Sequence, residues 1–236
     1  MPSSPFAPRS GPRVDVAPFR LSGTVVAALL NHRRSLDALG DAVHAAPYRG
    51  APKAVVLAMK PRGALVLPGE PLLADDDAGE LEVAAALGVV IGRTACAVAE
   101  ADALAHVAGY LVVADATVPH ASHFRPQIRA MARDGSCALG AAVVARGDVG
   151  DPDALTLRTF VDGRLLATTS TADHLRSTAR LIAEISDFMT LAPGDVLLTG
   201  SAPGAPRVHA GARVAVEIEG VGRLGPQVAR EERSAA

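Results

Sequence analysis

Aromatic residues are scarce in this chain: they account for 3% of its 236 residues, and tryptophan is absent. Proteins that bind single-stranded nucleic acids stack the bases on aromatic side chains, so the composition argues against that class. The formal net charge is only -2 at pH 7, which also argues against a surface that follows a phosphate backbone. We therefore expect no nucleic-acid partner.

Cysteine is scarce too, and long apolar runs are missing. The two cysteines are too few for a disulfide framework and are typical of a reducing compartment. The longest wholly apolar stretches, such as residues 25–30, fall far short of the roughly 20 residues that a membrane-spanning helix needs. The N-terminal region lacks the apolar segment of a signal peptide. We expect a cytoplasmic protein with no membrane partner.

Apolar residues are nevertheless plentiful enough for a core, since 49% of the residues are hydrophobic and 20% are charged. A chain that is disordered throughout would be poorer in apolar groups and would carry more net charge. Residues 1–20 are rich in proline, serine and arginine, and we expect a disordered tail there. The remaining residues, 21–236, have a length that suits a single domain.

Apolar periodicity outlines the elements. Apolar residues spaced three and four apart predict helices over 35–46 and 171–190, and a third helix is expected over 100–109 with Gly109 as its C-cap. Asp162 and Gly163 predict a tight hairpin turn. The predicted strands cover residues 21–30, 54–59, 81–91, 110–114, 156–161, 164–167, 196–198, 214–218 and 224–228.

These elements predict a β-rich mixed α/β fold with few helices. The strands are many and short, and 22 glycines and 17 prolines punctuate the chain. The strands and helices do not alternate as in a βαβ fold, and no phosphate-binding loop is present. A nucleotide-binding fold is therefore not expected.

Three long segments carry a recognisable pattern: LGVVIGRTACAVAEADALAHVAGYLVVAD (87–115), LAPGDVLLTGSAPG (191–204) and GARVAVEIEGVGRLGPQV (211–228). Together they resemble the fumarylacetoacetate hydrolase family, and the likeness runs in unbroken order over residues 21–232. The segments LNHRRSLDAL (30–39) and RDGSC (133–137) are similar to one branch. That branch is the N-terminal half, or separate N-terminal subunit, of the bifunctional isomerase/decarboxylase of 4-hydroxyphenylacetate degradation.

The resemblance implies a fumarylacetoacetate hydrolase-like mixed β-sandwich roll that forms a dimer. It also implies a divalent metal, usually Mg²⁺ or Mn²⁺, held by a Glu-x-Glu pair and a distant aspartate. Alternate residues of a strand point to one face, so such a pair directs two carboxylates at one ion. The ion would chelate a 2-oxo carboxylate or a diketone and act as a Lewis acid toward its enolate.

This sequence departs from the family pattern at the metal site. The two glutamate positions hold Ala84 and Ala86, and only the third ligand, Asp115, remains. A methyl group cannot coordinate, and one carboxylate is a poor site for an ion that takes six oxygens. Glu80 and Glu82 share the parity of the alanines but lie four residues earlier, about 13 Å along a strand, so we expect them to miss the site. We expect no cofactor, with Asp115 at most a residual ligand for Mg²⁺ or Mn²⁺.

Two further positions have lost the residue that the family carries. Met131 stands in place of a lysine that could stabilise an enolate, and Ser35 stands in place of a histidine. These losses fit the N-terminal branch, whose pattern also lacks the glutamate pair. Cys137 has no evident base partner, and we expect it in the core.

Asp115 and His32 are the candidate catalytic residues. Asp115 ends a buried strand at the family's site, as a general base or a residual ligand; capping of local backbone amides is the alternative. His32 follows the first strand, and a structural hydrogen bond is its alternative role. Arg125 and Arg133 are candidate substrate-binding residues, because a guanidinium group matches a carboxylate with two hydrogen bonds. Solvated surface positions are the alternative for both.

Thr199, Gly200 and Ser201 complete the candidate substrate-binding set. They match a Thr-Gly-Thr of the family, whose hydroxyl and amides contact the substrate. His120 and His123 would share one face if they lay on a helix, where they could serve as replacement ligands or acid–base groups. A solvated pair in a loop is the alternative.

Three functions follow from these residues and the resemblance. The first is an isomerase that shifts a double bond in a 5-carboxymethyl-2-hydroxymuconate-type substrate, acting with a decarboxylase half in 4-hydroxyphenylacetate catabolism. The second is a non-catalytic partner subunit of a metal-bearing paralogue. The third is a metal-dependent hydrolase, decarboxylase or hydratase of the same family. The expected partners are a small dicarboxylate or 2-oxo acid substrate, and a second subunit in a homodimer or in a heterodimer with a paralogue.

Overall fold

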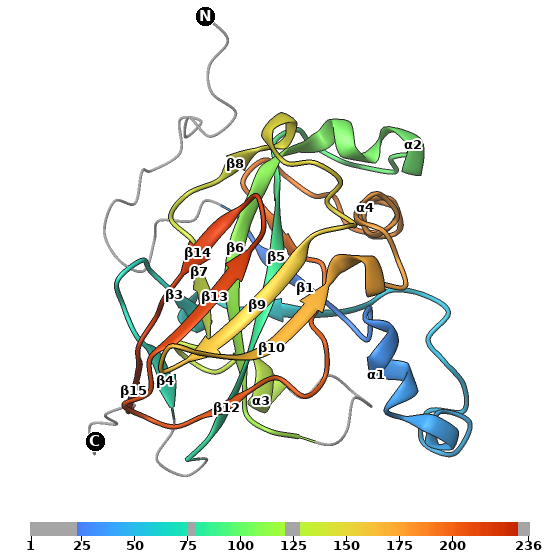
Figure 1. Cartoon of the computed structure of the whole chain (residues 1–236). Helices are drawn as coiled ribbons and strands as arrows, with labels where there is room; N and C mark the ends of the chain where they lie inside the picture. The colour runs from blue at the N-terminus through green and yellow to red at the C-terminus, as the bar shows by residue number, and fades with distance from the viewer. Residues whose placement is uncertain (1–22, 75–78, 121–127, 231–236) are drawn as a thin grey trace, which may run out of the picture.

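Strands dominate the fold. The structure is a computed structural model that describes residues 23–74, 79–120 and 128–230, so the expected tail lies outside the described part. The strands (Figure 1) are β1 (Val25–Leu29), β2 (Val56–Lys60), β3 (Leu65–Val66), β4 (Leu72–Ala74), β5 (Leu81–Ile91), β6 (Val107–Thr117), β7 (Cys137–Leu139), β8 (Val144–Ala145), β9 (Thr156–Val161), β10 (Arg164–Ser170), β11 (Val196–Leu198), β12 (Arg207–Val208), β13 (Val214–Ile218), β14 (Gly222–Leu224) and β15 (Val228–Arg230).

The helices are short. They are α1 (Arg33–Asp37), α2 (Glu100–Ala103), α3 (Ile128–Met131) and α4 (Thr178–Ser186), with single 3₁₀ turns at Gly40–Val43, Arg62–Ala64, Leu104–His106, Arg146–Asp148 and Thr171–Asp173. The predicted β-rich mixed α/β class with few helices is confirmed. Within the described residues, no helix has the length and apolar character needed to cross a membrane.

The long antiparallel pair of β5 and β6 lies at the centre of the largest sheet. This sheet has nine strands, in the order β2-β1-β11-β5-β6-β7-β3, with β12 paired to β5 and β8 paired to β6. The register of the central pair places Ala84 opposite Asp115 and Glu82 opposite Thr117. Ala84 stands where the family pattern has a metal ligand, and Asp115 is the ligand that this chain retains. The two are thus direct cross-strand neighbours.

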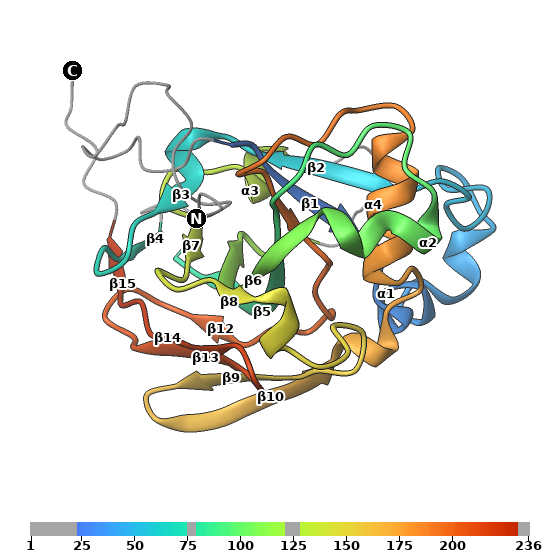
Figure 2. The same ribbon diagram turned by 90° about the horizontal axis from the view of Figure 1, so that it is seen from above.

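A four-stranded sheet, in the order β10-β9-β13-β14, covers one side of the central pair. Figure 2 shows it as a separate layer, with β5 and β6 between it and the strands β1 and β2. Leu87 and Val89 of β5 pack in this interface, in one core cluster with Val216 and Ile218 of β13, and all four are almost fully buried. Each such side chain contributes about 1.5–3 kcal/mol on burial, so the interface holds the two layers together.

The pleat of β5 separates the core from the site. Its odd-numbered residues face the core cluster between the sheets: Leu81, Val83, Ala85, Leu87, Val89 and Ile91. Its even-numbered residues point to the opposite face, as alternate residues of a strand must. We call this face of β5 and β6 the site face; it carries Glu82, Ala84, Ala86, Asp115 and Thr117.

Two of the predicted helices are shorter than the sequence pattern suggests. The helix expected over 35–46 ends at Asp37, and a 3₁₀ turn begins at Gly40, whose φ of 48° no continuing α-helix adopts. The helix expected over 171–190 begins only at Thr178, capped by the hydroxyl of Ser177. The stretch before it is drawn into a β-bridge between His174 and His32 instead, so tertiary pairing outweighs helical periodicity there.

The helix predicted over 100–109 is also wrong in its second half. It ends at Ala103, a 3₁₀ turn follows, and β6 already begins at Val107. Gly109 is therefore not a C-cap but a strand residue. A Cβ at this position would clash with the carbonyl oxygen of Val144, so glycine allows β8 to approach β6 closely.

Candidate functional site

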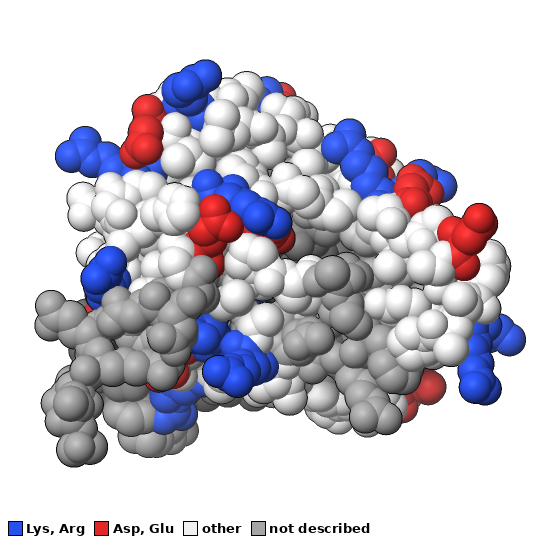
Figure 3. Space-filling view, turned by 90° about the horizontal axis from the view of Figure 1, so that it is seen from below, with Lys and Arg blue, Asp and Glu red and all other residues white. Residues whose placement is uncertain are grey.

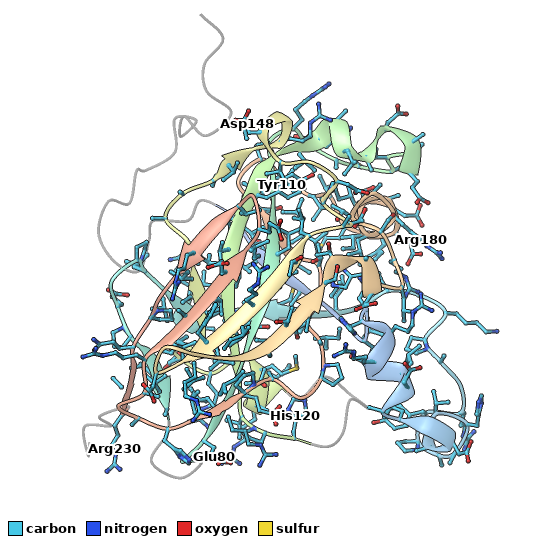
Figure 4. All side chains as sticks on the ribbon, viewed as in Figure 1. Glu80, Tyr110, His120, Asp148, Arg180 and Arg230 are labelled. Atoms are coloured by element: carbon cyan, nitrogen blue, oxygen red, sulfur yellow. The ribbon has the colours of Figure 1, made fainter. Side chains whose placement is uncertain are left out.

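The site face opens into a pocket of about 230 Å³, which we call the first pocket. It lies at one end of β5 and β6, where Figure 4 places His120, at the far end of the molecule from Asp148. The residues that line it come from β1, the site face, the region after β6 and the loop after β11. They are Ala27, Ala28, Leu29, Leu30, Ser35, Glu82, Ala84, Ala86, Asp115, Thr117, His120, Met131, Leu198 and residues 200–205.

Asp115 lies in the wall of this pocket and is 8% exposed. Ala84 and Ala86 lie on the same face and also line the pocket, so their methyl groups occupy the positions predicted for two metal ligands. The placement of these three residues around one cavity agrees with the sequence prediction. Of these three residues only Asp115 carries oxygen donors in its side chain.

Lys60 lies directly behind Asp115. Its Nζ atom is 2.6 Å from Oδ1 of Asp115, and it also donates a hydrogen bond of 2.7 Å to the carbonyl oxygen of Met131. The Lys60 side chain is fully buried and does not line the pocket, whereas the Asp115 carboxylate reaches it. The family pattern has a lysine at the position of Met131. In this structure Lys60 of β2 brings a positive charge to the backbone of that residue instead.

The charge state of Lys60 follows from its neighbour. Burial by itself lowers the pKa of the ammonium group, but the charge of Asp115, the neighbouring Cys137 and the hydrogen bond to Asp115 together outweigh burial, and the pKa lies above its usual value. Lys60 therefore remains protonated and forms a permanent countercharge to Asp115. The sequence analysis gave Lys60 no role beyond following a predicted strand. Lys60 lies two residues after Ala58 and therefore on the same face of the strand, and a lysine on a core-facing position requires a partner, which could have identified it.

Cys137 is the direct cross-strand neighbour of Asp115 on β7. Burial raises the pKa of its thiol far above the ordinary range, and the Asp115 charge adds to this effect. The thiol is neutral at physiological pH and belongs to the core cluster with Val113 and Leu139. It is therefore no nucleophile, as the sequence analysis expected.

Glu82 corrects one prediction from the sequence. We expected Glu80 and Glu82 to miss the site, but Glu82 lines the first pocket, because the cavity extends along β5 by one further pair of residues. Its Oε1 atom accepts a hydrogen bond of 3.3 Å from Nε of Arg207 on β12. Glu80 does not line the pocket; it pairs with Arg207 and with His209 near the end of β5.

His120 lines the first pocket and has a defined orientation. Its Nδ1 atom lies 2.9 Å from the carbonyl oxygen of Val118, which can only accept, so Nδ1 carries the proton. In the neutral ring the acceptor nitrogen is then Nε2. His123, its predicted partner, lies outside the described residues, and a joint role of the two stays a prediction.

The loop that follows β11 forms the opposite wall. Gly200 and Ser201 line the first pocket, while Thr199 is fully buried behind them. Gly200 has a φ of 114°, and a Cβ there would lie 3.2 Å from Cβ of Asn31 and 3.3 Å from the carbonyl oxygen of Ala28. Both the backbone angle and the tight space therefore require glycine.

Asn31 holds this loop in place. Its Nδ2 atom donates to the carbonyl oxygens of Thr199 at 2.8 Å and of Arg176 at 3.1 Å, and its Oδ1 atom accepts from the backbone N–H of Arg176 at 3.0 Å. The preceding residue, Leu30, lines the pocket with a φ of 55°, a conformation that non-glycine residues adopt mainly where surrounding structure enforces it. Leu30 and Asn31 at the end of β1 thus hold the pocket wall in a defined position.

Two of the other candidate residues, His32 and Arg133, do not line this pocket. His32 is 1% exposed, and its Nδ1 atom accepts a hydrogen bond from the backbone N–H of Arg34 at the start of α1, which matches its structural alternative. Burial lowers the pKa of His32, although Asp173 opposes this effect. Arg133 lies in the turn between α3 and β7 and does not line the pocket, and Arg125 lies outside the described residues. Catalytic and substrate-binding roles for these three residues stay predictions.

The residues present do not fit the divalent metal that the resemblance implies. Among the described residues, no three His, Cys, Asp or Glu side chains lie close enough together to hold a metal ion. Asp115, the one remaining ligand of the family pattern, directs Oδ1 at the Lys60 ammonium group. A hard cation that needs about six oxygens would meet the methyl groups of Ala84 and Ala86, and of the two carboxylates that line the pocket, Asp115 is paired with Lys60 and Glu82 with Arg207.

Comparisons with known proteins identify the family. The family described as Fumarylacetoacetate (FAA) hydrolase C-terminal matches residues 24–229. The 4-hydroxyphenylacetate degradation bifunctional isomerase/decarboxylase of Escherichia coli is 37% identical over 200 residues, which cover 85% of this chain and 46% of that protein. The chain thus spans about half the length of the curated relatives of this kind.

Solved structures share the fold. The 5-carboxymethyl-2-hydroxymuconate delta-isomerase from Mycobacterium smegmatis superposes with a TM-score of 0.74 at 30% identity, covering 90% of this chain and 81% of that one. Fumarylpyruvate hydrolase from Pseudomonas aeruginosa, in complex with Mn²⁺ and pyruvate, gives 0.74 at 25% identity, covering 88% and 90%. The family match over nearly the whole chain, together with these relatives, shows that the protein belongs to the fumarylacetoacetate hydrolase family.

Proposed function

We propose that this protein is an isomerase that converts a 2-hydroxymuconate-type di- or tricarboxylate into its 2-oxo-ene tautomer without a divalent metal. The observation that carries the proposal is the Asp115 carboxylate in the wall of the first pocket, with Lys60 as its buried countercharge. The isomerases and isomerase/decarboxylases among the relatives support the reaction class. The side chains at the family's metal-ligand positions support a reaction without a metal, because Ala84 and Ala86 offer no oxygen ligand.

The reaction needs one proton transfer and a place for negative charge. Asp115 accepts the proton of the enol hydroxyl group, and the electron pair left behind forms a dienolate. The same proton is then delivered to a carbon of the conjugated chain, so the substrate gains a 2-oxo group and Asp115 returns to its starting state. No atom is lost, and no oxidant or reductant takes part.

The loop after β11 is the proposed anion-binding wall. Gly200 and Ser201 line the pocket, where the serine hydroxyl group and backbone N–H groups are the available donors for the developing oxyanion. Lys60 does not touch the substrate space and is a positioning residue: it holds the Asp115 side chain and balances its charge. Together these groups supply a base and a preorganised wall.

The test is a spectroscopic assay with 5-carboxymethyl-2-hydroxymuconate. We expect the purified protein to change the ultraviolet spectrum of this dienol at the same rate in excess EDTA. The substitution Asp115→Asn is expected to lower kcat by about 100-fold or more, the range for loss of an acid–base group. Asp148→Asn is the matched control, since Figure 4 shows Asp148 at the opposite end of the molecule.

Three results would contradict the proposal. The first is an unchanged spectrum in the presence of the purified chain, alone and with a metal-bearing paralogue. The second is an activity that EDTA abolishes and Mg²⁺ or Mn²⁺ restores. The third is an Asp115→Asn variant that is as active as the Asp148→Asn control.

A second candidate function is a non-catalytic subunit that pairs with a metal-bearing paralogue. The observation that favours it is the length of the bifunctional relatives, of which this chain covers only 46%. In either case we propose a two-chain assembly, a homodimer or a heterodimer, that acts in the cytoplasm. Activity of the homogeneous chain in the assay above would exclude the non-catalytic role.

A further inference from the structure

A second pocket of about 240 Å³ lies next to the first. Arg34 of α1 lines it together with three threonines, Thr159 of β9 and Thr168 and Thr169 of β10. Figure 1 shows why these residues meet: β10 runs toward α1, and the segment after β11 passes between them and the central pair. The second pocket is therefore formed by both sheets and by the helix that follows β1.

The two pockets share a wall. Ala84 and residues 202–205 line both of them, so the two cavities adjoin along one loop and one residue of β5. This adjacency is what a ligand that reaches from one cavity into the other requires.

The chemistry of the second pocket differs from that of the first. The first contains Asp115 and Glu82, whereas no acidic residue is among those that line the second. Arg34 supplies a positive charge, and within the described ranges its guanidinium group makes no hydrogen bond or ion pair. Hydroxyl groups and an unpaired guanidinium group are donors, and a carboxylate is the acceptor that fits them.

We propose that the second pocket binds the distal carboxylate of a dicarboxylic substrate whose 2-oxo or 2-enol end lies at Asp115. The proposal rests on the proposed function for the reacting end and adds the substrate class: a chain with carboxylates at both ends. Arg34 pairs with the distal carboxylate, and the hydroxyl groups of Thr159 and Thr169, which lie on the core-facing side of β9 and β10, donate to it. Arg34 is thus a specificity-determining residue for the length and charge of the substrate.

The test measures binding without turnover. The probes are 2-oxoadipate, which has a carboxylate at both ends, and 2-oxohexanoate, which ends in a methyl group, titrated by calorimetry. We expect the natural protein to bind 2-oxoadipate about tenfold more tightly or better, the range for a hydrogen bond to a charged group. Arg34→Met is expected to remove this preference by weakening 2-oxoadipate alone.

Arg33 provides the matched control. It is the neighbouring exposed arginine of α1 and lines neither pocket, so Arg33→Met is expected to keep the preference. Thr169→Val is expected to reduce the preference by about threefold, because it removes one neutral donor and leaves the charge. Equal binding of both acids by the natural protein, no binding of either, or equal losses in the Arg33 and Arg34 variants would overturn the proposal.

The outcome can be separated from that of the isomerase assay. Discrimination between the two acids in a protein without isomerase activity would contradict the proposed function and leave the subsite in place. Isomerase activity in a protein that does not discriminate would contradict the subsite and leave the proposed reaction in place.

Discussion

At the scale of single residues, the Lys60–Asp115 pair determines how the site is built. Both side chains are withdrawn from water, and a buried ion pair costs desolvation that its attraction must offset. Lys60 recovers part of that cost through its hydrogen bond to Met131. The pair is therefore a device for placing one ionised carboxylate at an apolar pocket rather than a source of stability.

Lys60→Met is expected to lower the free energy of unfolding by about 3 kcal/mol, because it leaves Asp115 buried without its countercharge. Urea denaturation at pH 7 measures this change. The double substitution Lys60→Met with Asp115→Asn is expected to recover most of the loss, since no charge then remains to be paired. A double variant that is as unstable as Lys60→Met would show that packing, rather than charge, accounts for the effect.

His174 gives a prediction for pH dependence. Burial lowers its pKa from 6.5 to about 4 and His32 acts in the same direction, while Asp173 and a backbone hydrogen bond to Gly200 oppose the shift. The folded state keeps this histidine neutral while the unfolded chain takes up a proton below pH 6.5. The stability that it contributes is therefore complete above pH 6.5 and is lost as the pH falls from 6.5 toward 4.

Between pH 7.5 and pH 5 this single group is expected to cost about 2 kcal/mol of the free energy of unfolding. Denaturation curves at several pH values measure it, and His174→Gln is the comparison that lacks the titrating group. If both proteins lose the same stability over this range, His174 is not the group responsible.

At the scale of elements, the end of β1 and the loop after β11 act as one unit. Asn31 joins them by hydrogen bonds, and the approach of the two backbones leaves no room for a side chain at Gly200. A polar side chain buried against two loops is satisfied only in one arrangement, which gives the pocket wall a single conformation.

Gly200→Ala is expected to lower the free energy of unfolding by about 1–3 kcal/mol, because alanine is strained at a φ of 114° and presses on Asn31 and Ala28. It is also expected to weaken binding of 2-oxoadipate, since the wall shifts. Gly147→Ala is the control: a Cβ at Gly147 meets open space, and we expect a change within about 0.5 kcal/mol. Thermal melting measures both, and equal stability of the two variants would contradict the strain.

The strands were predicted more accurately from the sequence than the helices, because the strand signals are local whereas the ends of the helices depend on distant partners. The alternation along β5 and the Asp-Gly turn between β9 and β10 are local signals that the fold retains. The helix predicted over 171–190 lost its first turns because His174 pairs with His32, more than a hundred residues away in the chain. Periodicity carries no information about such a partner.

The site was predictable to a similar extent. Asp115, Ala84, Gly200 and Ser201 follow from family positions, and they do meet around one cavity. Lys60 was missed, because the strand that carries it becomes a neighbour of β6 only through tertiary packing. The role expected of Met131 was similarly incomplete, since its backbone rather than its side chain takes part.

At the scale of the whole molecule, the visible surface adds little that would select a partner by charge alone. Figure 3 shows basic and acidic side chains interspersed over the part of this face that is not grey, with broad uncharged areas between them. The selection of a dicarboxylate that we propose would therefore take place inside the pockets, where Arg34 and Asp115 lie, rather than through a field of one sign on this face.

The pleat of β5 has a consequence for how this protein can change. Leu87 and Val89 pack between the layers, whereas Glu82, Ala84 and Ala86 on the opposite face line the first pocket, so residues that stabilise the fold and residues that line the pocket lie on different faces of one strand. Carboxylate side chains on the pocket face of this strand can be replaced by methyl groups, or restored, without a change in the packing on the opposite face. New reactions can therefore arise by substitution at positions 84 and 86 while the fold is retained.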